Sequence, residues 1–314
     1  MRNAECGVRN GRNNVENVYV LRCLDTNPPH NPPPKAPFPF RTPHFPAPMS
    51  QNRIDLKFAA LRETSSKAFI AYICAGDPSF GATHALALRL EAAGVDILEL
   101  GVPFSDPLAD GIVNQLASQR ALDAGATPRG VLECVRQIRR DSQIPIVLYT
   151  YINPLLALGF QAFHREAEAA GVDGLLILDL PPDEDAPELA PVGGMRRIRL
   201  IAPTTPDDRI ARITAQADGF IYYVSREGVT GEQASVAESI AGRVAAIRRT
   251  TNVPVAVGFG VSNPDQARQV ARLADGVVVG SAIVKRIAQF AGQPDMPHLV
   301  AEFVRPLAAA AKLP

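Results

Sequence analysis

Hydrophobic positions alternate between two periods from residue 51 onward. Apolar runs of strand length are separated by stretches such as "VLECVRQIRRD", in which apolar residues recur every three or four positions. Runs that are apolar throughout are typical of parallel strands covered by helices. The eight runs are 68–73, 96–100, 144–150, 174–178, 198–201, 219–224, 253–257 and 276–279.

Eight strand–helix units in about 260 residues predict an α/β fold, one closed (β/α)8 TIM barrel. A doubly wound open sheet is the main alternative. The count of eight and the lack of a GxGxxG turn after the first run disfavour it. The stretch "MSQNRIDLKFAALRE" before the first run predicts an N-terminal helix, with apolar residues at Ile54, Phe58 and Leu61.

The chain before residue 50 has a different composition and no hydrophobic periodicity. Its prolines gather in "NPPHNPPPKAPFPFRTPHFPAP". We expect residues 1–50 to form a disordered Pro-rich extension and residues 51–314 to form the barrel domain. The extension lacks the apolar core of a signal peptide and the amphipathic helix of a transit peptide, so a targeting role is the less favoured interpretation. Another possibility is that translation starts at Met49.

Composition excludes some classes of partner. The chain has 32 basic and 32 acidic residues and a formal net charge of zero, which gives no electrostatic reason to expect nucleic acid or an anionic membrane as partner. Its longest apolar runs are too short to span a bilayer. The four cysteines form no CxxC or Cys/His cluster, which suits reduced thiols in the cytoplasm and indicates no structural metal site.

A glutamate interrupts the second apolar run, "DILELGVPFSDPLADG". Strand alternation places Ile97, Glu99 and Gly101 on one face, and both faces of a barrel strand are covered. An enclosed carboxyl either pairs with a cation or keeps its proton. The neighbouring runs supply no inward Arg or Lys. We therefore expect Glu99 to have a raised pKa and to exchange a proton near neutral pH.

Two aspartates follow in the stiff loop after this run. Both Asp106 and Asp110 could be turn or helix-capping residues, and that interpretation is the stronger one for Asp106 in Ser-Asp-Pro. Strand C-termini and the loops after them form the functional face of such barrels. Asp110 therefore supplies a second carboxylate over the same mouth as Glu99.

Glycines follow the last two predicted strands, in "VAVGFGVSNP" and "VVVGSAIVK". The second of these opens a helix at Ser281, and backbone N–H groups at a helix N-terminus bind phosphate in many such barrels. The loop "SREGVTGEQAS" after the sixth run has the length of a lid. These residues together predict a phosphorylated small molecule undergoing proton transfer without a metal or redox cofactor.

The same segments resemble one known family. "ICAGDP", "LELGVPFSDPLADG", "TYINPLLALG", "LDLPPDE", "APTTPDDRI", "YYVSREGVTG", "GFGVSNPDQ" and "GSAIVK" stand in the order and spacing of the tryptophan synthase α subunit. The resemblance covers about residues 52–290 and implies a TIM barrel. It also implies retro-aldol cleavage of indole-3-glycerol phosphate to indole and glyceraldehyde 3-phosphate.

The resemblance also assigns roles to residues. It implies that Glu99 is the acid/base that protonates indole C3, and that Asp110 accepts the indole N–H hydrogen bond. The other implied substrate contacts are Tyr222 beside Glu99, Tyr72 and Phe259 at the indole pocket, Thr230 in the lid, and Gly231, Gly260, Gly280 and Ser281 at the phosphate.

Four positions depart from the family pattern. Ile112 replaces a proline, Asn114 an apolar residue expected at the indole pocket, Cys74 a threonine and Tyr149 a leucine. We expect activity to persist, with altered pocket packing or altered coupling to the partner.

The resemblance implies an α2β2 complex with a pyridoxal-phosphate β subunit, bound through the loops after the second and third strands. This chain itself would need no cofactor. The open alternatives are a stand-alone indole-releasing lyase and a catalytically weak subunit that activates a β partner. An indole-glycerol-phosphate synthase is disfavoured because Lys285 lies beyond the last strand rather than in the barrel.

Overall fold

The computed structural model describes residues 52–181, 189, 193–225, 233–258 and 260–312. For residues 233–236 it describes the backbone only. The chain divides into two units, Met1–Pro46 and Ala47–Pro314, and the barrel belongs to the second. The extension predicted over residues 1–50 lies outside the described residues and stays a prediction.

Eight parallel strands close into a barrel in sequence order, and β1 pairs with both β2 and β8. Each predicted run overlaps one strand, so the predicted TIM barrel is confirmed. The strand ends lie within two residues of the ends of these runs. The largest extension is at β5, which starts two residues before its apolar run because Arg196 and Arg197 already pair through their backbones with β4. The strands are β1 (Ala68–Cys74), β2 (Ile97–Gly101), β3 (Ile146–Thr150), β4 (Gly174–Ile177), β5 (Arg196–Ile201), β6 (Ile221–Val224), β7 (Val255–Gly258) and β8 (Gly276–Val279).

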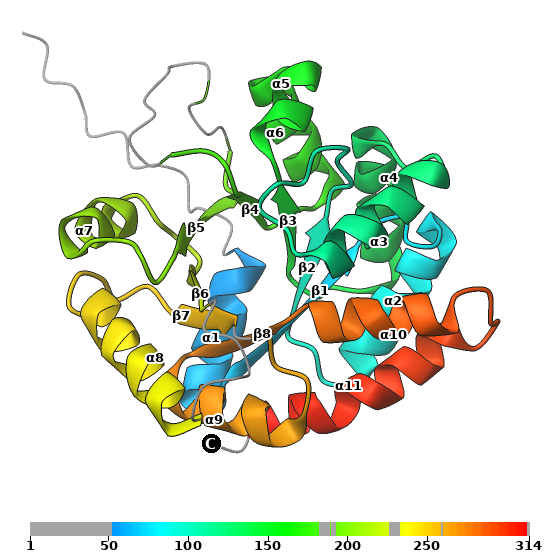
Figure 1. Cartoon of the computed structure of the whole chain (residues 1–314). Coiled ribbons are helices and arrows are strands. Elements are labelled where there is room, and N and C mark those ends of the chain that lie inside the picture. Colours follow the sequence, from blue (N-terminus) through cyan, green and yellow to red (C-terminus); the bar gives the residue numbers. More distant parts are fainter. Residues whose placement is uncertain (1–51, 182–188, 190–192, 226–232, 259, 313–314) are drawn as a thin grey trace, which may run out of the picture. The chain divides into compact units, whose positions relative to one another are not determined.

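Helices surround the strands, as Figure 1 shows. Several start at the polar residue expected for a cap: the Ser79, Thr127 and Asn263 side chains each accept a hydrogen bond from a first-turn N–H. None of the described helices has both the length and the apolar content needed to cross a lipid bilayer. The helices are α1 (Arg53–Glu63), α2 (Phe80–Ala92), α3 (Ile112–Asp123), α4 (Pro128–Asp141), α5 (Ile152–Leu158), α6 (Phe160–Ala170), α7 (Asp207–Ala215), α8 (Gln233–Arg248), α9 (Pro264–Leu273), α10 (Ser281–Phe290) and α11 (Met296–Lys312).

Strand alternation separates two apolar cores. In β2, Leu98 and Leu100 pack outward against the helices, whereas Ile97 belongs to the cluster inside the barrel. Glu99, two residues after Ile97, therefore faces the interior too. The predicted pair of faces is confirmed, and it places a carboxyl group within the barrel.

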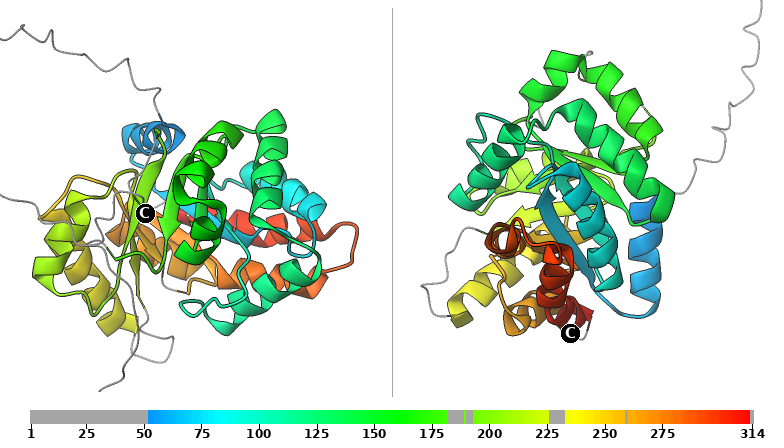
Figure 2. Two further views of the ribbon diagram at one scale, coloured as in Figure 1. Left: turned by 90° about the horizontal axis from the view of Figure 1, so that it is seen from above. Right: turned by 90° about the vertical axis from the view of Figure 1, so that its right-hand side faces the viewer.

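Helix α1 covers one end of this interior. Ile54 and Phe58 pack with the interior residues of the strands, and Figure 2 shows α1, in blue, at one end of the barrel. The Asn52 side-chain amide donates to the carbonyl of Asp173, just before β4, so the covered end is that of the strand N-termini. Access to the interior is therefore left to the C-terminal end, where the predicted site residues lie.

Four aspartates join the strands in pairs at the N-terminal end, a repeat that hydrophobic periodicity does not reveal. Each aspartate lies one to three residues before an even-numbered strand. Its carboxylate accepts a hydrogen bond from a backbone N–H in the first two residues of the odd-numbered strand that comes before. The pairs are Asp96 with Phe69, Asp173 with Ile146, Asp218 with Arg197, and Asp275 with Val255. The barrel is thus built from four similar two-strand units.

Candidate active site

Glu99 is fully buried in the barrel interior, with an exposed fraction of 0%. Neither of its carboxyl oxygens has a hydrogen-bond partner within the described part of the chain. Burial raises the pKa of Glu99 from 4.5 to about 8, because a charged carboxylate loses its hydration there. Glu99 therefore holds its proton at neutral pH and is close to releasing it, as the sequence predicted.

Two tyrosines interact with Glu99, Tyr72 from the neighbouring strand β1 and Tyr222 from β6. Tyr72 lies opposite Glu99 in the β1–β2 register. Electrostatic interaction with Glu99 contributes to the raised pKa of both Tyr72 and Tyr222, although burial is the larger cause. The structure thus places these two expected substrate contacts around the expected acid.

Each of these tyrosine rings lies over a glycine of the next strand. A Cβ atom added at Gly101 would lie 2.5 Å from the Tyr72 hydroxyl, and one added at Gly258 would lie 2.7 Å from the Tyr222 hydroxyl. Real Cβ atoms do not approach this closely, so both strands need glycine at these positions. The two glycines give the tyrosines room to lie across the mouth of the barrel.

Asp110 lies in the loop between β2 and α3, half-buried, and it is held by three side-chain donors. The hydroxyl of Tyr149 donates to Oδ1 at 3.0 Å and the hydroxyl of Tyr151 donates to Oδ2 at 2.8 Å. The Asn114 amide also donates to Oδ1, at 3.3 Å. Burial raises the pKa of Asp110, and these three hydrogen bonds oppose the rise.

A capping role does not explain Asp110. The N-cap residue of α3 is Gly111, and no side chain caps this helix. Asp106, in contrast, is exposed, and its carbonyl accepts the Leu108 N–H within the loop. The structure therefore separates the two aspartates as the sequence analysis did: Asp106 shapes the loop, and Asp110 faces the polar groups of the site.

The two carboxyl groups have opposite environments. Glu99 is fully enclosed and lacks donors, whereas Asp110 is partly accessible and has three. The first arrangement favours a protonated carboxylic acid and the second favours an ionised carboxylate. One acid and one acceptor over the same barrel mouth can divide a proton transfer between them.

Two of the expected phosphate contacts, Gly280 and Ser281, lie next to β1 on its other side. Gly280 is the N-cap residue of α10, and Ser281 is the first, exposed residue of that helix. A Cβ atom added at Gly280 would lie 3.4 Å from Cβ of Tyr72. Because β1 pairs with both β2 and β8, the Tyr72 side chain lies between Glu99 and the N-terminus of α10. This N-terminus suits an anionic group.

The remaining expected contacts are described only in part. Gly260 follows β7 with φ of +69°, a conformation that glycine adopts without strain. Phe259, Thr230 and Gly231 lie outside the described residues. Their assignment to the indole pocket, the lid and the phosphate stays a prediction.

Sequence reasoning did not identify the residues that hold Asp110. Tyr149 and Asn114 were noted only as departures from a pattern, and Tyr151 was not singled out. A signal was present in "YTY" at the end of the third run, since strand alternation places both tyrosines on one face. Their polar tips at a strand C-terminus could have been matched to the carboxylate of the preceding loop.

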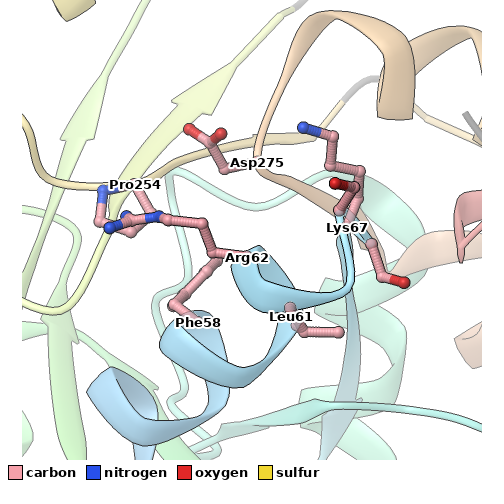
Figure 3. Close-up of a pocket in the computed structure, with 8 residues that line it drawn as sticks. Phe58, Leu61, Arg62, Lys67, Pro254 and Asp275 are labelled. Carbon is pink, nitrogen blue, oxygen red and sulfur yellow. The ribbon is translucent and has the colours of Figure 1, made fainter.

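A separate pocket lies at the opposite end of the barrel. Figure 3 shows its lining by Phe58, Leu61 and Arg62 of α1, by Lys67 before β1, and by Pro254 and Asp275 before β7 and β8. These residues belong to the N-terminal end of the strands, the end that supports stability in barrels of this class. No group of three potential metal-binding side chains occurs among the described residues.

Comparisons with known proteins agree with this geometry. The family model for the tryptophan synthase alpha chain matches residues 58–312. The tryptophan synthase alpha chain of Opitutus terrae is 54% identical over 246 residues, which cover 78% of this chain and 92% of that protein. The corresponding chain of Geobacter sulfurreducens is 51% identical over 258 residues, covering 82% of this chain and 97% of that one.

Solved structures give the same result. Tryptophan synthase subunit alpha from Legionella pneumophila superposes with a TM-score of 0.75 at 34% identity, covering 83% of this chain and 99% of that chain. A chain of tryptophan synthase from M. tuberculosis in an open form gives a TM-score of 0.74 at 34% identity, covering 84% and 100%. The chain therefore belongs to the tryptophan synthase alpha chain family, and it is an indole-3-glycerol-phosphate lyase of tryptophan biosynthesis.

Proposed function

We propose that Glu99 and Asp110 carry out this lyase reaction with divided roles: Glu99 is the acid/base and Asp110 accepts a hydrogen bond from the indole N–H. The observation that supports the division is the contrast in their surroundings. Glu99 has two buried oxygens without partners within the described residues, and Asp110 accepts three side-chain hydrogen bonds.

The roles follow from the bond that must break. Cleavage between indole C3 and the glycerol carbon requires a proton at C3 and loss of the proton from the neighbouring hydroxyl. The protonated Glu99 gives its proton to C3, while Asp110 accepts the hydrogen bond of the indole N–H and so raises the electron density of the ring at C3. The carboxylate left on Glu99 then takes the hydroxyl proton as the carbon–carbon bond breaks. Indole and the aldehyde leave, and Glu99 is again protonated.

The substrate's other groups fit the remaining residues. Tyr72, Tyr222 and Phe259 form the walls around the indole ring, and Thr230 closes over Asp110 from the lid. The phosphate binds at the start of α10 through Gly280 and Ser281, together with Gly260 and Gly231. This division places the anionic end of the substrate where the helix dipole favours it.

We assign the partner as a tryptophan synthase β subunit that carries pyridoxal phosphate and forms an α2β2 complex in the cytoplasm, while this chain binds no cofactor of its own. Large apolar side chains are exposed on the loop after β2, on α3 and on α5. They are Leu108 at 81%, Ile112 at 65%, Leu116 at 52% and Leu156 at 49% exposed. Exposed apolar groups on neighbouring elements are typical of an interaction surface. Because the same loop carries Asp110, partner binding and catalysis would be coupled.

Indole formation from indole-3-glycerol phosphate, with and without β subunit, tests these assignments. Glu99→Gln and Asp110→Asn should each lower kcat by about 100-fold or more while the circular dichroism spectrum is retained. Glu133→Gln, at an exposed position on α4, is the matched control and should not change turnover. Near-normal turnover of Glu99→Gln would remove Glu99 from the mechanism. No turnover under either condition would contradict both lyase assignments and leave the weak regulatory subunit.

A further inference from the structure

Two side chains from separate elements meet at one oxygen of Asp110. Tyr149 belongs to β3 and Asn114 to the first turn of α3, yet both donate to Oδ1, at 3.0 and 3.3 Å. These are also two of the four positions at which the sequence departs from the family pattern. The departures are therefore connected in space, through the carboxylate that the proposed function assigns to the indole N–H.

The donor directions follow from the chemistry of the groups. An ionised carboxylate only accepts hydrogen bonds, so Tyr149 must present its hydroxyl proton and Asn114 its amide NH2 group. This leaves the amide Oδ1 of Asn114 as the other end of the group, and that atom is buried without a partner among the described residues. An orphaned acceptor is costly, so the orientation is kept because of the bond to Asp110.

The two oxygens of Asp110 are unequally occupied. Oδ1 accepts from Tyr149 and Asn114, whereas Oδ2 accepts from Tyr151 alone among the described side chains. Each carboxylate oxygen has two acceptor sites. The free acceptor site is therefore on Oδ2, and it is available to a donor on the substrate.

Both donors are fixed by their own elements, while Asp110 lies in a loop. The Tyr149 ring packs edge-on against Tyr72, with ring centroids 4.9 Å apart. The Asn114 backbone N–H donates to Gly111 at 3.0 Å in the first turn of α3. Side chains held by a strand and a helix can hold a loop carboxylate in one orientation.

We propose that Tyr149 and Asn114 are positioning residues that hold Oδ1 of Asp110, so that Oδ2 is presented to the indole N–H. The resemblance gives a leucine and an apolar residue at these positions, whereas here the two side chains form a polar clamp on the acceptor. This inference rests on the proposed role of Asp110. The clamp acts on turnover through Asp110, and neither residue takes part in the bond changes.

The clamp also affects the ionisation of Asp110. Hydrogen bonds from Tyr149 and Asn114 oppose the rise in pKa that burial causes. Among the described residues, five titratable groups interact electrostatically with Asp110. They are Tyr72 and Cys74 in β1, Tyr149 in β3, Tyr151 directly after β3, and Tyr222 in β6. All of them are neutral acids with raised pKa values, so the donors are what favours the ionised form.

The test is the pH dependence of indole release by Tyr149→Phe, Asn114→Leu and the double variant. Each single variant should lower kcat about tenfold and move its acidic limb about one pH unit higher, because charge-assisted hydrogen bonds to Asp110 are lost. The double variant should lose less than the product of the two single effects, since both donors serve one oxygen. Gln119→Leu, which also replaces a side-chain amide by leucine but at an exposed site on α3, should leave the profile unchanged.

Other results would overturn the inference. Unchanged kcat and an unshifted acidic limb in both single variants would show that the clamp does not position Asp110. A rise in KM alone, with the limb unmoved, would reduce the two residues to packing groups. If Tyr149→Phe lost its native circular dichroism, Tyr149→Leu would be measured instead. Asp110→Asn separates the two levels: if it keeps full turnover, the role of Asp110 itself is wrong.

Discussion

Replacing Glu99 by glutamine should make the folded protein more stable at alkaline pH while it removes the acid required for turnover. Glutamine has the shape of a protonated glutamate but does not ionise. The substitution therefore isolates the free-energy cost of placing an ionisable group in the barrel interior.

The size of the effect follows from the pKa of Glu99, which burial raises from 4.5 to about 8. Between these two values the unfolded chain releases the proton and the folded chain keeps it, so the free energy of unfolding falls as pH rises through this window. Each pKa unit corresponds to about 1.4 kcal/mol, so the wild type loses about 5 kcal/mol by pH 8 and above. The variant does not have this loss.

Urea unfolding of both proteins at pH 5 and pH 8.5 measures the difference. The buried amide of glutamine has its own cost, but that cost is equal at both pH values and cancels. The stability of the variant relative to the wild type should therefore rise by about 4 kcal/mol from pH 5 to pH 8.5. Glu133→Gln, which changes an exposed carboxylate on α4, should show no comparable rise.

A relative stability that is the same at both pH values, within about 1 kcal/mol, would refute this reasoning. It would mean that Glu99 is already ionised at pH 5 in the folded protein. A cation or a set of donors would then have to compensate its charge. The case for Glu99 as a proton donor at neutral pH would fail with it.

Two further predictions concern residues outside the catalytic pair. Asp173→Ala should lower the free energy of unfolding by about 3–5 kcal/mol, because it removes the carboxylate that accepts from Nη2 of the largely buried Arg139 and from the Ile146 N–H. Asp265→Ala, at an exposed ion pair on α9, should lower it by less than about 1 kcal/mol in the same urea titration. Gly101→Ala places a methyl group 2.5 Å from the Tyr72 hydroxyl. We therefore expect a lower kcat/KM and a free energy of unfolding that is lower by about 1–3 kcal/mol. Gly242→Ala, where the added atom meets nothing within 4 Å, should retain full activity, and equal kcat/KM for the two variants would contradict the close approach.

Much of the barrel could be predicted because its signal is local. A strand that is apolar on both faces must be covered on both, and eight such runs with intervening helices allow few topologies. The boundary of β5 could not be predicted in this way, because backbone pairing extended the strand through two arginines. The four aspartates before the even-numbered strands were also missed, since their partners lie 20 to 30 positions away in sequence, as with Asp96 and Phe69.

The candidate site was predictable to different degrees for each residue. Glu99 was visible because a carboxyl group in an apolar strand has no ordinary explanation. Asp110 was visible only as one of two similar aspartates in a loop, and its partners from β3 and α3 were not. A hydrogen bond across about 40 residues leaves no periodic trace in the chain.

The sequence by itself determined the class of fold, the burial of Glu99 and the family, because each depends on which residue types follow one another along the chain. Only the tertiary structure decided how the two carboxyl groups differ. Closure of the barrel brought Tyr149, Tyr151 and Asn114 to Asp110, while no described donor was brought to Glu99. The physical reason is that the pKa of a carboxyl group depends on the hydration and donors around it, and these come from residues distant in sequence.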